Sequence, residues 1–357
     1  MKKKRILCLG ILVIAMIFSA CSKAGGSELK IEEPPAINAE LQPYDGDFFN
    51  IKLPKGWEIK TVGEYENFGF RAYDPEKPSR QIFFYGNMKY FMKSSEGKEA
   101  WNRYMAEGGY ADAGVYADAP VLSPATTEEF YNTFDEFASY AKKYGIDHDF
   151  PVFNDLEILE TTPRNSPIAS NCIEDSILRV LFKNDDIPCE GLFAAGVADT
   201  MTSYMYDVDA GYYTVYVITG ISAPADEFYQ LKDTLLKSLS SFKYTDRYVE
   251  QGVARSRWGT ELALQVGRTL SEAADSYNEA WSNRQRVNDA LSQKRSDANL
   301  GYDRLYDTET GEVYRAELGF YDQYDTNREE FENIDLQPVP DDDYDLYEKE
   351  IKGYIYK

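Results

Sequence analysis

Hydrophobic and polar residues alternate with a period of two in four runs that begin shortly after residue 45. The runs cover residues 49–53, 57–62, 68–73 and 81–85, with turn residues such as Pro54 and Gly56 between them. This alternation is typical of strands that bury one face. We therefore predict that the folded part of the chain starts with a series of strands.

Four more strand-like runs follow, at residues 156–161, 176–182, 191–198 and 212–221, and no helical pattern separates them. Consecutive strands without crossover helices favour an antiparallel sheet. The apolar spacing then becomes that of an amphipathic helix that ends near residue 242. Its apolar residues are Phe228, Leu231, Leu235, Leu239 and Phe242. We predict an α+β fold in which helices flank an antiparallel sheet.

Residues 93–149 separate the two groups of strands and carry two helical patterns, at 98–106 and 128–144. Thr126 and Glu129 have the spacing of a capping box at the start of the second helix. The pattern predicts a helical insertion between the strands.

Two short motifs at the ends of this region resemble the two ends of a PsbP/Mog1-like domain. They are Leu53-Pro54-Lys55-Gly56-Trp57 near the first strand and Leu-Leu-Lys-Ser-Leu-Ser-Ser-Phe at 235–242. The resemblance implies one domain over residues 45–245, in which helices sandwich an antiparallel sheet and 93–149 is inserted. It also implies a binding or assembly role, and it supplies no catalytic residues.

Residues 246–299 have the pattern of one long amphipathic helix. Apolar or small residues recur at intervals of three and four from Val266 to Leu291, and Arg284 interrupts them once. Such a heptad-like seam packs either on the protein's own body or against another chain in a coiled coil. Both interpretations stay open.

The last segment, residues 300–357, is acidic and rich in tyrosine. From residue 301 onward it holds nine tyrosines, 17 acidic residues and 6 basic residues. Residues 304–306 and 312–314 predict a β-hairpin with Gly311 at the strained position of the turn. Because disordered acidic segments are poor in aromatic residues, we expect an ordered appendage held by the seam of the preceding helix.

The tyrosines of this segment are candidates for a binding surface, because tyrosine offers a wide contact area at low entropic cost. The alternative is that many of them are half-buried strand residues. The candidates are Tyr302, Tyr306, Tyr314, Tyr321 and Tyr324. Residues 296–301 and 307–314 also resemble the tail of uncharacterised lipoproteins of Gram-positive gut bacteria, a resemblance that implies no activity.

The N-terminus has the pattern of an export signal. Four cations at residues 2–5 precede an apolar run at 6–18, which is too short to span a membrane. Ser19-Ala20-Cys21 resembles the bacterial lipobox, with Phe18 in place of the usual leucine. The resemblance implies that residues 1–20 are removed, that Cys21 carries a diacylglycerol, and that the protein is anchored on the outer face of the cytoplasmic membrane. Small polar residues then predict a flexible tether over 21–44.

The net charge of −23 restricts the partners. Nucleic acid and anionic lipid would repel such a surface, so we expect no nucleic-acid partner and membrane attachment through the lipid alone. We expect no cofactor either, because the sequence has no P-loop and no G-x-G-x-x-G motif. The single histidine, His148, excludes a zinc site built on several histidines, and its position between two aspartates predicts a solvated loop residue.

Cys172 and Cys189 are candidates for a disulfide, since an exported protein folds in an oxidising compartment. The predicted hairpin argues against the bond, because a turn near Asp185 would place Cys189 opposite Leu181, well along the strand from Cys172. The sequence leaves both possibilities open.

These observations favour a lipid-anchored binding or interaction protein of the bacterial envelope, with a protein or polysaccharide partner. One alternative is a cell-wall polymer hydrolase that uses two carboxylates with displaced pKa values in one cleft. A second is the solute-binding lipoprotein of a transporter, for which two lobes of alternating strands and helices are expected. The uninterrupted strands between 156 and 221 argue against this second alternative.

Overall fold

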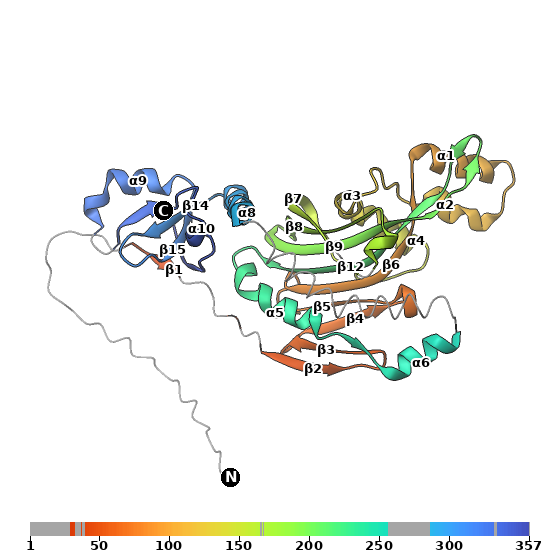
Figure 1. The fold of residues 1–357 in the computed structure, drawn as a ribbon, viewed down its shortest axis with the longest axis horizontal. Coiled ribbons are helices and arrows are strands. Elements are labelled where there is room, and N and C mark those ends of the chain that lie inside the picture. The colour runs from red at the N-terminus through yellow and green to blue at the C-terminus, as the bar shows by residue number, and fades with distance from the viewer. Residues whose placement is uncertain are drawn as a thin grey trace, which may run out of the picture.

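The computed structural model describes most of the chain after residue 28 (Figure 1). It contains a large seven-stranded sheet, a three-stranded sheet, a two-stranded hairpin and a five-stranded sheet formed mainly by the C-terminal segment. The described residues are 29–32, 37, 40–164, 166, 168–255, 286–331 and 334–356.

The seven-stranded sheet is antiparallel between every pair of neighbours. It contains the four consecutive strands that the sequence predicts without crossover helices, so the α+β prediction is confirmed in its coarse form. In sheet order its strands are β4 (Glu58–Val62), β5 (Gly69–Tyr73), β6 (Gln81–Met92), β12 (Tyr212–Pro224), β9 (Ile187–Met201), β8 (Glu174–Asn184) and β7 (Asn154–Pro163).

One face of this sheet is covered by helix α5 (Phe228–Ser240) and by the three-stranded sheet of β13 (Lys243–Tyr244), β3 (Phe49–Pro54) and β2 (Leu41–Asp45). The predicted apolar stripe of α5 is buried, with Leu235, Leu239 and Phe242 at 0% exposure. Burying such a stripe is the main source of stability for a short surface helix. The first predicted strand, β3, therefore belongs to the smaller sheet.

The other face is covered by α3 (Thr127–Asn132) and α4 (Phe134–Lys143), which bury Phe130, Phe134 and Phe137 in a second apolar core. The sequence predicts a single helix here. The structure has two, because Thr133 leaves helical geometry at φ −93° and ψ 0° and its hydroxyl donates to the Glu129 carbonyl at 2.8 Å. A threonine bonded back in this way bends a helix.

Beyond one end of the large sheet lie α1 (Ser95–Ala106), α2 (Gly114–Asp118) and the hairpin of β10 (Tyr204–Met205) and β11 (Val208–Asp209) (Figure 1). Helix α1 starts three residues before the predicted helix, because the Ser94 hydroxyl accepts from the Gly97 amide and caps it.

The C-terminal segment folds around a five-stranded sheet. Its strands, in sheet order, are β1 (Ile31–Glu32), β17 (Ile351–Ile355), β15 (Val313–Glu317), β14 (Tyr302–Asp307) and β16 (Leu336–Pro338). The helices around it are α8 (Arg286–Leu300), α9 (Phe320–Thr326) and α10 (Tyr344–Tyr347). Strands β14 and β15 form the predicted hairpin, with Gly311 at φ +68°, a conformation that favours glycine.

The predicted tether over 21–44 is wrong at residues 31–32 and 41–44, which form strands. Ile31 and Glu32 pair with Ile355 and Tyr354 of β17, and β2 pairs with β3. Backbone pairing on two sheet edges orders residues whose side-chain pattern alone carries no strand signal. The predicted signal segment and Cys21 lie outside the described residues. None of the helices that the structure describes is both long and apolar enough to cross a membrane.

Most of the predicted helical seam, Val266 to Arg284, also lies outside the described residues, which resume in α8. The last seam position, Leu291, is 51% exposed. Helix α8 instead buries a largely polar face that contains Ser292, Ser296 and Asp297. The predicted seam is therefore wrong at Leu291.

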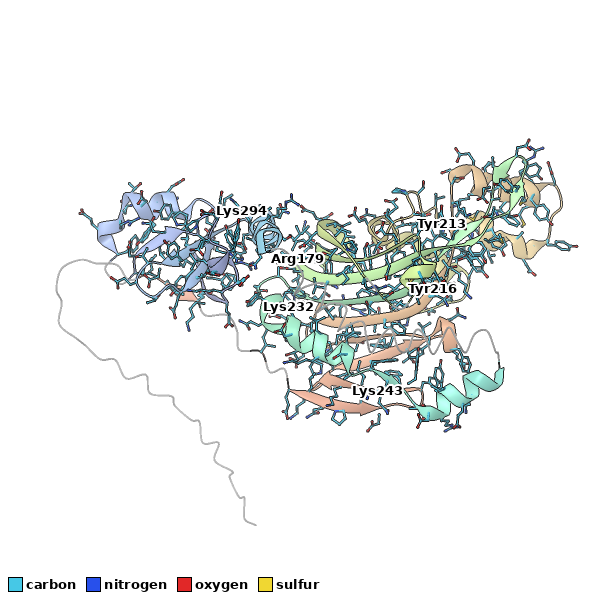
Figure 2. The ribbon with its side chains drawn as sticks, viewed as in Figure 1. Arg179, Tyr213, Tyr216, Lys232, Lys243 and Lys294 are labelled. Atoms are coloured by element: carbon cyan, nitrogen blue, oxygen red, sulfur yellow. The ribbon has the colours of Figure 1, made fainter. Side chains whose placement is uncertain are left out.

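Helix α8 (Arg286–Leu300) joins the C-terminal sheet to the large sheet. The Ser292 hydroxyl donates to Glu160 at 2.8 Å, and the Asn299 amide donates to Glu157 at 2.6 Å, both on β7. Deeper in the junction, Arg179 pairs with Glu190 at 2.6 Å. Figure 2 labels Arg179 at this end of the large sheet and Lys294 on α8.

Candidate functional site

A buried carboxylate, Asp297 of α8, organises the C-terminal unit. It is 3% exposed and accepts from Arg304 Nε at 2.7 Å and from Arg315 Nε at 2.8 Å. Arg304 and Arg315 are direct partners on β14 and β15, so their side chains leave the same face of the sheet, the face that α8 crosses. The Asp297 carboxylate attracts both buried cations, and the charge of Glu190 also acts on Arg315.

The arginine pair is held by further contacts. Arg304 Nη1 donates to the Gln293 side-chain oxygen at 2.6 Å and to the Tyr347 carbonyl at 3.1 Å, and its guanidinium lies 5.2 Å from the centre of the Tyr347 ring. Burial acts to lower the pKa of Arg315, but the Asp297 carboxylate holds it above its ordinary value. The Arg315 guanidinium therefore stays charged at neutral pH.

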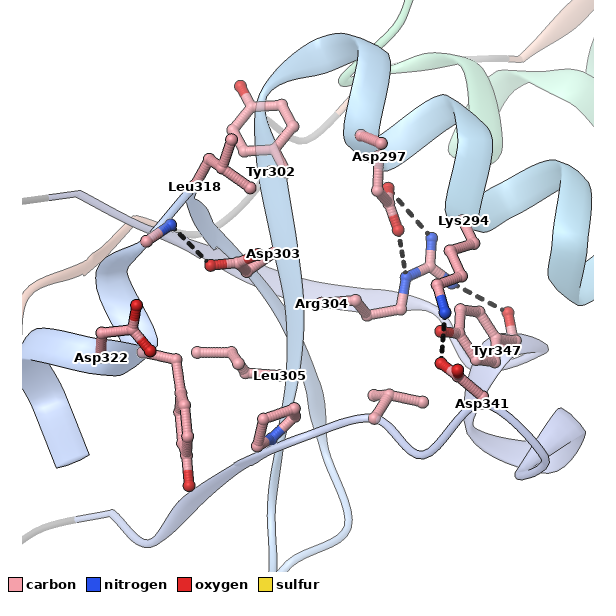
Figure 3. Close-up of a pocket in the computed structure, with 15 residues that line it drawn as sticks. Lys294, Asp297, Tyr302, Asp303, Arg304, Leu305, Leu318, Asp322, Asp341 and Tyr347 are labelled. Atoms are coloured by element: carbon pink, nitrogen blue, oxygen red, sulfur yellow. Dashed lines mark hydrogen bonds and ion pairs between the residues drawn. The ribbon is translucent and has the colours of Figure 1, made fainter.

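A cleft of about 570 Å³ runs along β14 beside this cluster. Figure 3 shows that β14 divides its lining residues into two sets. Asp297, Arg304, Lys294, Asp341 and Tyr347 lie toward α8 and α10, and we call this the ion-paired end. Asp303, Leu318 and Asp322 lie on the other side, and we call this the α9 end. It includes Tyr321, the neighbour of Asp322 in α9. The division follows from strand geometry, because successive side chains point to opposite faces.

At the ion-paired end, the charged side chains form ion pairs with one another. Lys294 and Asp341 form an ion pair beside the Arg304–Asp297 pair (Figure 3). The hydrogen bond to Asp341 raises the pKa of Lys294, so this cation is also permanently charged at neutral pH.

The α9 end is more open. Leu318 is 61% exposed, Asp322 is exposed, and Asp303 and Tyr321 are half-buried. The Asp303 carboxylate accepts from the Gly319 amide at 2.8 Å, which fixes the start of α9, and Gly319 has a φ of +76°. Within the described residues, neither Asp303 nor Asp322 pairs with a cation. This end therefore carries uncompensated negative charge beside an aromatic ring.

The tyrosines around the cleft act as neutral groups. Burial raises the pKa of Tyr302, Tyr321 and Tyr347 above the ordinary phenol value. At neutral pH their rings can stack on a cation or an apolar group, and their hydroxyls can donate or accept hydrogen bonds.

The structure divides the five predicted binding tyrosines. Tyr302 and Tyr321 line the cleft. Tyr306 is half-buried against the apolar core near α10. Tyr314 and Tyr324 are core residues at 5% and 1% exposure, which corrects their prediction as binding residues. Tyr324 has a structural role, because its hydroxyl donates to the Ile334 carbonyl and accepts from the Leu336 amide.

Sequence reasoning missed Asp297 and Tyr347. Asp297 lies in a helix whose apolar spacing points to another face, and Tyr347 lies in a one-turn helix, α10, that is capped by Asp343. The available signal was the run Asp341–Asp343 followed by paired tyrosines, which marks a helix start but no ligand site.

The candidate disulfide is wrong. Both cysteines are free. The backbone beside Cys172 bonds to Val197 of β9, whereas Cys189 lies opposite Phe182, eight residues further along that strand. Eight strand residues span about 26 Å, and a disulfide needs Cα atoms within about 7 Å. The predicted hairpin is present, with Cys189 opposite Phe182 and not opposite Leu181, and its geometry keeps the two cysteines apart.

His148 is not the solvated loop residue that its neighbours suggest. Its ring centre lies 4.9 Å from that of Phe150, and its Nε2 lies 3.1 Å from the Tyr85 hydroxyl. Burial lowers the pKa of His148 to about 4, so it is neutral at physiological pH. It lines a second, open cavity of about 650 Å³ together with Lys60, Thr61, Lys142, Asp147 and Asp149.

Within the described part of the chain, no three side chains among its acidic, histidine and cysteine residues are grouped to hold a metal ion. The cleft is lined by carboxylates, a guanidinium and an ammonium group, and phenol rings, which can bind a ligand by charge and stacking.

Comparison with known proteins gives one kind of likeness. No protein-family model and no curated protein matches the chain. Among solved structures, the chain is similar to the solution structure of cyanobacterial PsbP (CyanoP) from Synechocystis sp. PCC 6803, with 14% sequence identity and a TM-score of 0.26. That match covers 58% of this chain and 94% of the other. No function is drawn from this similarity, and membership of the PsbP/Mog1-like family stays a prediction.

Proposed function

We propose that this protein is a lipid-anchored binding protein on the outer face of a bacterial cytoplasmic membrane, and that the cleft beside β14 is its ligand site. The anchoring half of the proposal is supported by the sequence at residues 2–21, with Cys21 as the lipidated residue. The binding half is supported by the cleft.

The observation that carries the binding half is a cleft of ligand size whose charged lining is already fixed. Its volume of about 570 Å³ lies within the roughly 300–1,000 Å³ of small-molecule sites. Asp297 and its two arginines hold β14 and α8 in place without help from a ligand. A site that needs little ordering on association loses less binding free energy to entropy.

The contents of the cleft support binding over hydrolysis. A hydrolase with paired carboxylates needs one whose pKa is raised so that it can act as an acid. Burial raises the pKa of Asp135. This residue lies on α4, which packs on the large sheet, and it does not line the cleft. A transporter's solute-binding protein would have alternating strands and helices in two lobes, whereas the seven-stranded sheet is antiparallel throughout.

Site-specific photocrosslinking in intact cells tests the proposal. A photoreactive amino acid is placed at Leu318, which is 61% exposed at the α9 end, and at Tyr110, which is 82% exposed near α1. We expect a specific crosslinked envelope component from position 318 and a different pattern, or none, from position 110. Crosslinks that are the same at both positions, or absent at 318, would reject the cleft as the ligand site.

A further inference from the structure

The C-terminal segment binds its own arginines in a repeated way. Arg304 pairs with Asp297 and lies 5.2 Å from the Tyr347 ring centre, and Arg315 pairs with the same carboxylate 5.7 Å from the Tyr302 ring centre. Arg328 shows the same combination outside the core: it pairs with Asp325 and Asp335 at 2.9 Å and lies 5.6 Å from the Tyr324 ring centre.

All three arginines that follow residue 301 thus have a carboxylate and a tyrosine ring as partners. The combination suits a guanidinium group. Its edge donates two hydrogen bonds to a carboxylate, and its face stacks on an aromatic ring.

The α9 end of the cleft presents the same kinds of group. Arg328 donates to the Tyr321 hydroxyl at 3.1 Å and pairs with Asp325 and Asp335, not with Asp303 or Asp322. This end offers the carboxylates of Asp303 and Asp322 and the ring of Tyr321, with the exposed side chain of Leu318 beside them. No cation in the described part of the chain pairs with either carboxylate. At the ion-paired end the equivalent groups are already occupied by Arg304 and Lys294 (Figure 3).

We infer that the α9 end of the cleft binds an arginine side chain of a basic protein or peptide partner. This rests on the proposed function and specifies its ligand class. The guanidinium sits between Asp303 and Asp322 against the Tyr321 ring, and Leu318 covers the aliphatic part of the side chain. The net charge of −23 attracts such a partner before contact, which raises the association rate.

Cleft size favours a side chain with flanking backbone over an isolated ion. A volume of about 570 Å³ exceeds what one guanidinium group fills, so a short peptide segment can enter beside β14. The Lys294–Asp341 pair then lies within the same cleft and can contact the peptide backbone or its next side chain.

The test compares two peptides that differ in charge alone. The protein without residues 1–20 is titrated with N-acetyl-Gly-Arg-Gly-amide and with the same peptide carrying citrulline, which has the shape of arginine but no charge. We expect the arginine peptide to bind at least tenfold more tightly, and its affinity to fall when NaCl is raised, because exposed charges are screened over about 8–10 Å at physiological salt.

Two variants test whether the arginine peptide binds at the α9 end of the cleft. Asp303→Asn together with Asp322→Asn keeps the acceptor for the Gly319 amide but removes both charges, and it should weaken the arginine peptide about tenfold while leaving the citrulline peptide unchanged. Asp207→Asn removes one exposed charge in the β10–β11 turn and should change neither. Thermal unfolding of each variant verifies that it is folded.

Equal affinity of the two peptides for the unmodified protein, or no binding of either at millimolar concentration, would overturn the inference even if the double variant fails to fold. Neither result affects the photocrosslinking at Leu318. An envelope partner crosslinked there with no preference for arginine would reject the ligand class and leave the proposed function standing.

Discussion

Arg304 and Arg315 face each other across the β14–β15 hairpin, and both side chains end on the carboxylate of Asp297 in α8. Like charges directly opposite each other on one sheet face are normally destabilising. Here both cations are attracted to the shared carboxylate, so ion pairs hold α8 against the sheet where an apolar stripe would be expected.

This relationship makes Asp297 a stability residue. Asp297→Ala leaves two buried guanidinium groups without a counter-ion, and removing one partner of a buried ion pair costs about 3–5 kcal/mol. We expect a loss of this order in the free energy of unfolding, measured by urea denaturation. The matched control is Lys294→Ala, one turn away, which breaks a pair whose side chains are 50% and 80% exposed and should cost less than about 1 kcal/mol. Equal losses of unfolding free energy for the two variants would contradict the stabilising role of Asp297.

The two thiols should react slowly in the native protein. Burial raises the pKa of both Cys172 and Cys189 to about 12, and the thiolate is the reactive form. At pH 8 we expect both to be alkylated about a hundredfold or more slower than a free cysteine, and at the ordinary rate in denaturant. Peptide mapping under non-reducing conditions provides the check, and a recovered Cys172–Cys189 bridge would refute the geometry of β8 and β9.

Stability should depend on pH through His148. Its pKa is lowered to about 4 in the folded protein against about 6.5 in the unfolded chain, so the unfolded state binds more protons between these values. The stabilisation is therefore complete above pH 6.5 and falls as the pH drops toward 4. Because the ring is only partly buried, we expect a loss of about 1–2 kcal/mol.

The matched variant is His148→Gln, which keeps a hydrogen-bonding group near the Tyr85 hydroxyl but does not titrate. Urea denaturation at pH 7.5 and pH 4.5 should show a smaller drop in the free energy of unfolding for the variant than for the unmodified protein. The same drop in both would show that other groups carry the pH dependence.

Cys21 should determine membrane attachment. A diacylglycerol provides two acyl chains, which hold a protein firmly, whereas one chain binds reversibly. We expect Cys21→Ala to accumulate as unprocessed precursor or to leave the membrane fraction, as followed by immunoblotting of cell fractions. Normal processing and unchanged membrane fractionation of the variant would reject the lipid anchor. Cys8→Ala is the control and should behave like the unmodified protein.

Local patterns in the sequence determined most of the fold. The period-two runs became strands of antiparallel sheets. The apolar stripe from Phe228 to Phe242 became the buried face of α5 and of the two residues that follow it. The hairpin at 302–317 followed from its turn residues and Gly311. These elements were predictable because hydrophobic spacing and turn chemistry act over a few residues.

The candidate site was decided by the tertiary structure alone. Tyr321 and Tyr324 lie three residues apart on α9, yet one lines the cleft and the other bonds to Ile334 and Leu336 in the core. Asp297 became central because α8 crosses the one sheet face that carries Arg304 and Arg315. Sequence spacing could not show this, because the contact depends on how a helix docks on a hairpin, and the buried partners are polar groups that hydrophobic patterns do not register.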